Sequence, residues 1–92
     1  MTSDVIEIVN KWSKTKKDMF ISLKSYIKEN NKIYTKDVKD AKDINEKSWY
    51  SYVGQETTRK IGTYHNREQA GEGNAYFEFT IDVNAFYELI EK

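Results

Sequence analysis

Hydrophobic residues recur at helical spacing in two segments of the N-terminal third of the chain. The first segment predicts an amphipathic helix near residues 4–12, and the second predicts a helix near residues 19–27. Their apolar positions are Val5, Ile8, Val9 and Trp12, then Met19, Phe20, Leu23, Tyr26 and Ile27. The polar stretch 13–17 between them is either a short break capped by Ser13 or Thr15, or the polar face of one long helix.

A turn near Asp43 separates two further helical segments. After a short extended stretch at 32–35, Thr35 is expected to cap the first of these helices and Asn45 the second. The apolar positions of this unit are Val38, Ala41, Ile44, Trp49 and Val53. Their spacing predicts a helix-turn-helix over residues 36–56, in which two short helices meet at a steep angle.

The second helix of this unit cannot continue far beyond Val53 with the same buried face. Further helical turns would bring the charged residues Glu56 and Lys60 onto that face. We therefore expect the helix to end or bend within residues 54–58, so that it spans 46–58 at most.

Alternation of apolar and polar residues predicts that the next part of the chain is β structure. The clearest strand covers residues 75–81, and residues 61–66 form a second candidate strand. The polar loop between them contains two glycines, so the two strands are expected to form a hairpin over 61–81.

The order helix, short strand, helix, turn, helix, strand, loop, strand resembles the winged helix-turn-helix family over residues 16–82. Residues 38–53 carry the most specific part, which also resembles the helix-turn-helix of lactose-repressor-type regulators. Two positions depart from that pattern, because Asp43 stands where Gly is common and Trp49 is bulkier than the Val found there. The resemblance implies an α+β fold in a single domain, 1–92, with a three-helix core, a C-terminal β-hairpin wing, and flanking helices at both termini.

In winged-helix proteins the second helix of the motif usually enters the DNA major groove, and the wing touches the flanking backbone or the minor groove. Carried over to this chain, the resemblance implies a recognition helix at 46–58 whose side chains face base edges and phosphates. Arg59 would hold the backbone beside it, and Arg67 at the wing tip would reach phosphate or a narrow minor groove. The implied DNA-binding residues are Lys47, Tyr50, Ser51, Thr58, Arg59 and Arg67. The expected function is binding of double-stranded DNA, as a regulator or replication accessory of a mobile element such as a phage or plasmid.

The charge balance weakens this expectation, because many duplex-binding modules are clearly basic. The chain has 15 Lys and Arg and 15 Asp and Glu, so its formal net charge is zero. Residues 1–47 carry 11 Lys against 8 acidic residues, and residues 48–92 carry 4 basic against 7 acidic residues, which allows one basic and one acidic face. Two alternatives stay open: single-stranded DNA stacked on Tyr50, Tyr64 and Tyr76, and a protein-binding module such as a phage-encoded inhibitor or an assembly adaptor.

The sequence contains no recognisable catalytic or metal-binding pattern. No nucleophile and base arrangement and no phosphate-binding glycine loop is apparent, so neither catalysis nor a cofactor is expected. His65 is the only histidine and cysteine is absent, which argues against a zinc site and fits the cytoplasm. No apolar run is long enough to cross a bilayer, so no membrane partner is expected. Lys14, Lys16 and Lys17 form a small basic cluster that we expect to be a solvated helix face.

Amphipathic helices are expected to flank the winged unit at both ends. One lies near residues 4–12, and the other over 83–91 is capped by Asp82 or Asn84. Their apolar faces either build a homodimer interface, which would place two recognition helices about one DNA turn apart, or cover the core of the same molecule. The sequence leaves both alternatives open.

Overall fold

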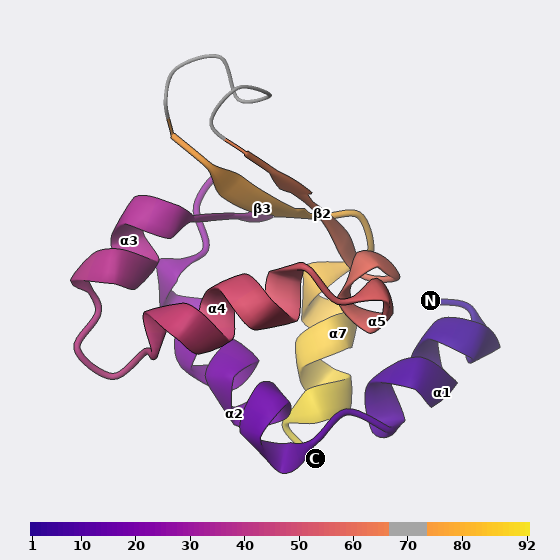
Figure 1. Cartoon of the computed structure of the whole chain (residues 1–92). Coiled ribbons are helices and arrows are strands. Elements are labelled where there is room, and N and C mark those ends of the chain that lie inside the picture. Colours follow the sequence, from indigo (N-terminus) through magenta and orange to yellow (C-terminus); the bar gives the residue numbers. More distant parts are fainter. Residues whose placement is uncertain (67–73) are drawn as a thin grey trace.

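The computed structural model describes residues 1–66 and 74–92 of the chain. Within them the fold is α+β, as expected, with helices packed against a small antiparallel sheet (Figure 1). The helices are α1 (Ser3–Asn10), α2 (Lys14–Leu23), the 3₁₀ turn η1 (Lys24–Tyr26), α3 (Thr35–Asp40), α4 (Glu46–Val53), α5 (Glu56–Arg59) and α7 (Val83–Ile90). The strands are β1 (Lys32–Tyr34), β2 (Gly62–His65) and β3 (Tyr76–Phe79).

Polar side chains determine where α2 and α7 begin. The hydroxyl of Ser13 accepts a hydrogen bond from the N–H of Lys16 (3.2 Å), so residues 13–17 contain a helix break followed by a new start. At α7, Asp82 Oδ1 accepts a hydrogen bond from the N–H of Ala85 (3.0 Å). Such caps satisfy N–H groups that have no partner inside their own helix. The capped break and the cap at Asp82 are therefore confirmed.

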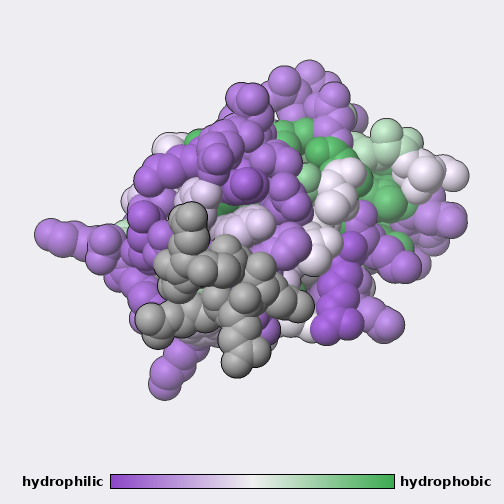
Figure 2. Space-filling model, turned by 90° about the horizontal axis from the view of Figure 1, so that it is seen from above, coloured by the Kyte–Doolittle hydropathy of each residue, from purple (hydrophilic) through white to green (hydrophobic). Residues whose placement is uncertain are grey.

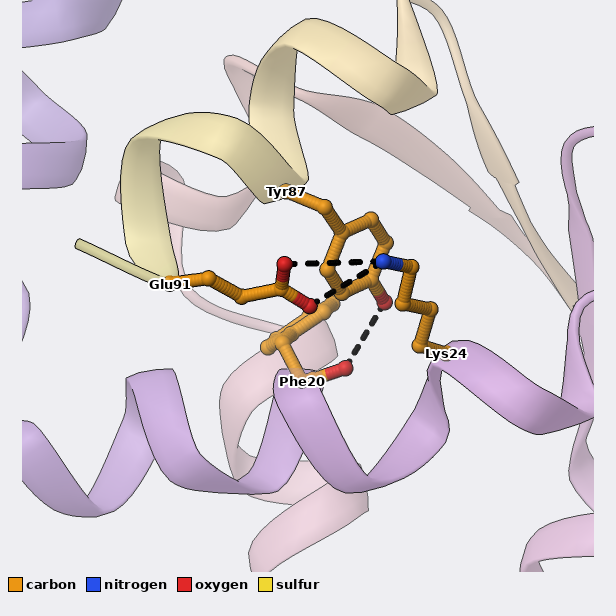
Figure 3. A network of polar contacts seen from close by, with 4 residues as sticks. All are labelled: Phe20, Lys24, Tyr87 and Glu91. Atoms are coloured by element: carbon orange, nitrogen blue, oxygen red, sulfur yellow. Dashed lines mark hydrogen bonds and ion pairs between the residues drawn. The ribbon is translucent and has the colours of Figure 1, made fainter.

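A polar contact inside the core fastens α7 to α2 (Figure 3). The hydroxyl of Tyr87 donates a 2.7 Å hydrogen bond to the backbone carbonyl of Phe20. That carbonyl is available because α2 tightens at its end, where the N–H of Lys24 donates to the carbonyl of Ile21, three residues back. Lys24 also forms a 3.2 Å ion pair with Glu91. Burial and the nearby Glu91 carboxylate raise the pKa of Tyr87, so its hydroxyl stays protonated and keeps donating.

Aromatic rings form the centre of the core. Phe20 contacts Trp12, Phe77 and Phe86, with ring centroids 5.2, 6.0 and 5.9 Å apart. Trp49 of α4 reaches Phe77 of the central strand at 6.3 Å. These contacts bring α2, α4 and α7 against one face of the sheet. Large rings bury much area per residue, which lets a chain of 92 residues build a core.

The sheet has the order β1-β3-β2, and the central strand β3 pairs antiparallel with both neighbours. The pairing of β2 with β3 is the one that the predicted hairpin requires, while its loop residues 67–73 lie outside the described residues. At the start of β2, Gly62 passes very close to β3. A Cβ at this position would lie 2.5 Å from the carbonyl oxygen of Glu78, so only glycine fits without a shift of the strands.

A tight turn precedes β1. Glu29 and Asn30 have positive φ angles of 55° and 72°, and the N–H of Asn31 donates to the carbonyl of Lys28 (3.2 Å). Positive φ at both central residues is typical of the turn type that matches the twist of paired strands. Lys28 and Lys32 form the bridge across this turn, which holds both lysines at the β1 edge of the sheet. Asn tolerates this conformation better than Glu, whose left-handed backbone costs about 1 kcal/mol.

α3 and α4 coincide with the predicted helix-turn-helix segment, but the link between them differs from the expected one. Among the described non-glycine residues, positive φ occurs at Glu29 and Asn30 alone. Asp43 therefore does not adopt the left-handed conformation that Gly supplies in similar motifs. Residues 41–45 join the two helices. The expectation that Thr35 caps α3 is wrong, because Tyr34 precedes the helix and makes no side-chain cap.

The expectation of one helix over 46–58 is corrected by the structure. α4 ends at Val53, Gly54 follows as its capping residue, and a separate short helix α5 begins at Glu56. The predicted end or bend within residues 54–58 is thereby confirmed, and it keeps the charge of Glu56 out of the core. In the described ranges, no helix has the length and apolar character needed to span a membrane.

Candidate nucleic-acid interface

The cap at the start of α4 and the packing of its inner side decide which side chains project outward. Asn45 Oδ1 accepts a hydrogen bond from the N–H of Ser48 (3.1 Å), as expected from the sequence. On the inner face Trp49 is fully buried. The predicted site residues Lys47, Tyr50 and Ser51 project from the other side, and all three are exposed. Tyr50 is 43% exposed, which is unusual for so large an apolar ring in this molecule.

Two linked hydrogen bonds, one buried and one partly buried, hold α4 against the rest of the fold. Trp49 Nε1 donates to Thr35 Oγ1 (3.2 Å), and that hydroxyl lies 3.2 Å from the hydroxyl of Tyr64. The three residues come from α4, α3 and β2. Thr35 is thus used to link these three elements, which explains why its hydroxyl does not cap α3. The contact restrains the rotation of α4 about its axis, so Lys47 and Tyr50 keep a defined direction.

A hollow of about 260 Å³ lies between α3, α4 and the base of the hairpin. It is lined by Thr35, Lys36, Lys39, Tyr50, Tyr64, Asn74 and Ala75. Lys36 and Lys39 are exposed and bring two ammonium groups to the same surface as Tyr50. Lys39 also faces Glu46 of α4, with 4.0 Å between Nζ and Oε1. These two lysines were not among the site residues predicted from the sequence, although their spacing of three residues places them on one helix face.

The break after α4 separates Thr58 from the other predicted site residues. Thr58 lies in α5 and is fully buried, so the expectation that it faces DNA is corrected. Arg59, one residue later, is exposed and lines a hollow of about 330 Å³ together with Gly54 and Tyr64. Arg67 lies outside the described residues. The structure therefore brings Lys47, Tyr50 and Ser51 together on α4, with Arg59 beyond the end of that helix.

The side chain of Lys16, from α2, contacts the junction between α4 and α5. The sequence predicted it on a solvated face, but it is only 3% exposed, so this expectation is wrong. Its ammonium group donates to Gln55 Oε1 and Thr57 Oγ1, both at 3.0 Å, and lies 4.0 Å from the centroid of the Trp12 ring. No carboxylate accompanies it among these contacts, and burial lowers its pKa from 10.5 to about 8. Lys16 thus has a structural role, because it connects α2 to the junction between α4 and α5.

The terminal helices use their apolar faces within the chain. α1 packs on α7, and Trp12 beside α1 contacts Phe86 at 5.7 Å between ring centroids. Figure 2, which looks down from the hairpin end, shows mostly hydrophilic residues on that face, with hydrophobic side chains exposed on the side of α1. A hollow of about 470 Å³ next to Val5 and Ile8 lies along α1. The terminal helices therefore cover the core of their own molecule, and dimerisation stays a prediction.

Comparison with known proteins adds no relative. No protein-family model matches the chain, and neither the curated proteins nor the solved structures give a significant match. Within residues 1–66 and 74–92, no three His, Asp or Glu side chains are grouped so as to hold a metal ion.

Proposed function

We propose that this protein is a winged-helix module that binds double-stranded DNA through α4. The observation that carries the proposal is the exposed face of this helix, where Lys47, Tyr50 and Ser51 project opposite the buried Trp49. A helix that reads the major groove needs one face fixed to the protein and another that offers donors and acceptors to bases and phosphates. α4 has both faces, and the hydrogen bond from Trp49 Nε1 to Thr35 Oγ1 fixes the direction in which each face points.

The order of the elements supports the winged-helix interpretation. Helices α2, α3 and α4 precede the β2–β3 hairpin, with the short helix α5 between α4 and β2. Strand β1 lies between α2 and α3 in the chain and pairs with β3. In Figure 1 the hairpin rises beside α3 and α4, so that helix and hairpin can approach one duplex together. The 260 Å³ hollow marks where they meet.

The side chains of this surface can bind a DNA duplex, but through only a few phosphate contacts. Lys36, Lys47 and Arg59 supply exposed positive charge, whereas Lys39 is partly neutralised by Glu46. Hydroxyl groups such as that of Ser51 can bond base edges or phosphates. Three phosphate contacts would give a dependence of log K on log salt with a slope of about −2.7, so binding is expected only at low ionic strength.

The experiment is a titration of labelled random duplex at low salt with a Lys47→Ala, Arg59→Ala double variant. Loss of both cations removes one charge from α4 and one from α5, so the duplex complex should disappear and any residual salt slope should be lower by about 2. Both side chains are exposed, so the fold should not change.

The matched control removes two lysines elsewhere, in a Lys14→Ala, Lys92→Ala variant. Both residues are exposed. Lys14 is the first residue of α2, and Lys92 lies at the C end, which Figure 1 marks away from the hairpin. Because this variant has the same net charge as the test variant, it should bind duplex more tightly if α4 is the interface. Equal duplex affinity of the two variants would overturn the proposal.

A further inference from the structure

The outer face of the sheet carries a row of aromatic rings that crosses all three strands. On β3, Phe77 points into the core, so Tyr76 points to the opposite face. Tyr76 is paired in register with Tyr34 of β1 and with His65 of β2, and residues paired in this way share a face. The ring centroids are 5.6 Å apart for Tyr34 and Tyr76, and 4.7 Å apart for His65 and Tyr76. The three rings therefore form one continuous aromatic row, and none of them is fully buried.

One end of this row borders a groove of about 520 Å³ at the β1 edge of the sheet. It is lined by Lys28, Glu29, Lys32, Tyr34, Lys36, Asn74 and Tyr76. Ligand sites in proteins commonly occupy about 300–1,000 Å³, so the groove is large enough for one nucleotide unit. The turn at Glu29 and Asn30 places Lys28 next to Lys32, which brings their positive charges to the same edge.

The charges along this groove favour an anion. Its lining includes three lysines and one carboxylate. The ammonium group of Lys32 lies 5.0 Å from the ring centroid of Tyr76, and that of Lys36 lies 5.6 Å from the ring of Tyr34. Carboxylates nearby offset part of this charge, since Asp37 pairs with Lys28 at 3.0 Å and Glu29 lies 3.8 Å from Lys32. Tyr34 and Tyr76 are partly exposed, and positive charge beside accessible aromatic rings is the combination that holds a phosphate backbone while bases stack.

We propose that this groove binds single-stranded nucleic acid, with bases on Tyr34 and Tyr76 and phosphates at Lys32 and Lys36. The site lies next to the α4 face and shares Lys36 with it, but binding in the groove does not require duplex binding at α4. The two surfaces adjoin, because Lys36 and Asn74 line both the 520 Å³ groove and the 260 Å³ hollow beside α4. A single-stranded nucleic acid in the groove would therefore pass close to α4.

The test is a fluorescence-anisotropy titration with a labelled oligothymidylate of about twelve nucleotides, a length within the range of about 4–16 nucleotides that single-strand sites cover. Tyr76→Leu keeps an apolar side chain on the sheet but removes the π-face, and it leaves the net charge unchanged. It should weaken oligothymidylate binding at least about tenfold, whereas Tyr76→Trp should restore it, because stacking accounts for that much affinity per base. Lys32→Gln should lower the salt slope by about 0.7.

Three controls separate this site from α4 and from loss of folding. Tyr50→Leu, on α4, should leave oligothymidylate binding unchanged. The Lys47→Ala, Arg59→Ala variant should likewise keep it, so failure of the duplex proposal would leave this one standing. Urea midpoints would verify that each variant is folded, and Tyr34→Leu supplies a second test if Tyr76→Leu does not fold. Absence of oligothymidylate binding at low salt, equal affinity for Tyr76→Leu and wild type, or loss of affinity in Tyr50→Leu instead, would each overturn the proposal.

Discussion

The loss of the Lys16 proton should by itself make the folded protein more stable as the pH is raised above neutrality. Burial lowers the pKa of Lys16 to about 8 in the folded state, against 10.5 for an ordinary lysine. Between these two values the unfolded chain binds the Lys16 proton and the folded chain does not. Stability rises with pH wherever the unfolded state binds more protons, so the free energy of unfolding increases as the pH passes through about 8 and levels off above about 10.5.

The magnitude follows from the two pKa values and the contacts of the ammonium group. Integrating the difference in bound protons from about pH 7 to about pH 9.5 gives roughly 2 kcal/mol of added stability. The Trp12 ring at 4.0 Å and the acceptors on Gln55 and Thr57 favour the charged form, and they are already opposed by desolvation of a side chain that is 3% exposed. A gain of about 1–3 kcal/mol is therefore expected, since one pKa unit corresponds to about 1.4 kcal/mol.

The assay is urea unfolding at a series of pH values, followed by circular dichroism, for wild type and Lys16→Met. Methionine fills similar space without a titrating group, so other groups that titrate in this range affect both proteins alike. The difference in unfolding free energy, wild type minus variant, should rise by about 2 kcal/mol across the range. A difference that stays constant within about 0.5 kcal/mol would refute the assignment of Lys16 as a buried, desolvated amine.

Four further substitutions should lower stability in urea unfolding at neutral pH, by different amounts. Gly62→Ala should cost about 2–3 kcal/mol, because its Cβ would overlap β3; a loss below about 1 kcal/mol would contradict that close approach. Tyr87→Phe should cost about 1–2 kcal/mol through its buried hydrogen bond, whereas Glu91→Gln, which breaks a partly exposed ion pair, should cost under about 0.5 kcal/mol. Thr35→Val leaves the indole N–H of Trp49 without its acceptor and should cost about 1–3 kcal/mol; a neutral result would argue against the anchor of α4.

Features that depend on neighbouring residues were predictable from the sequence. The caps at Ser13, Asn45 and Asp82 are hydrogen bonds across three residues, so a short window of sequence contains both partners. The alternation around Phe77 likewise shows which side chains of a strand face the core. The break after Val53 followed from the charge of the residues beyond it.

Features that depend on distant partners could not be predicted in this way. Thr35 has the residue type of a helix cap, but Trp49 and Tyr64 engage its hydroxyl from elements that follow it in the chain. Lys16 lies in a polar stretch and is buried only because residues of the α4–α5 junction close over it. Such burial requires knowledge of which segments pack together, and local spacing does not contain it.

The same limits apply to the candidate site. The outward direction of Lys47, Tyr50 and Ser51 follows from the helical position of the buried Trp49, and the structure has all three exposed. Thr58 was misplaced because the helix was extended across its break. The groove at β1 escaped notice because it combines residues from the turn, from two strands and from α3, which only the folded sheet brings together.

If α4 binds the major groove as proposed, its short length limits how much DNA sequence one molecule can recognise. Eight residues rise only about 12 Å along the helix axis, a length comparable to three or four stacked base pairs. A word of four base pairs recurs about once in every 250 positions of random sequence, so recognition by α4 alone would leave very many equivalent sites in a genome. Selectivity for one site would then need additional contacts. Several copies of the protein could bind repeated four-base-pair sequences together, or a partner protein could hold it at one locus.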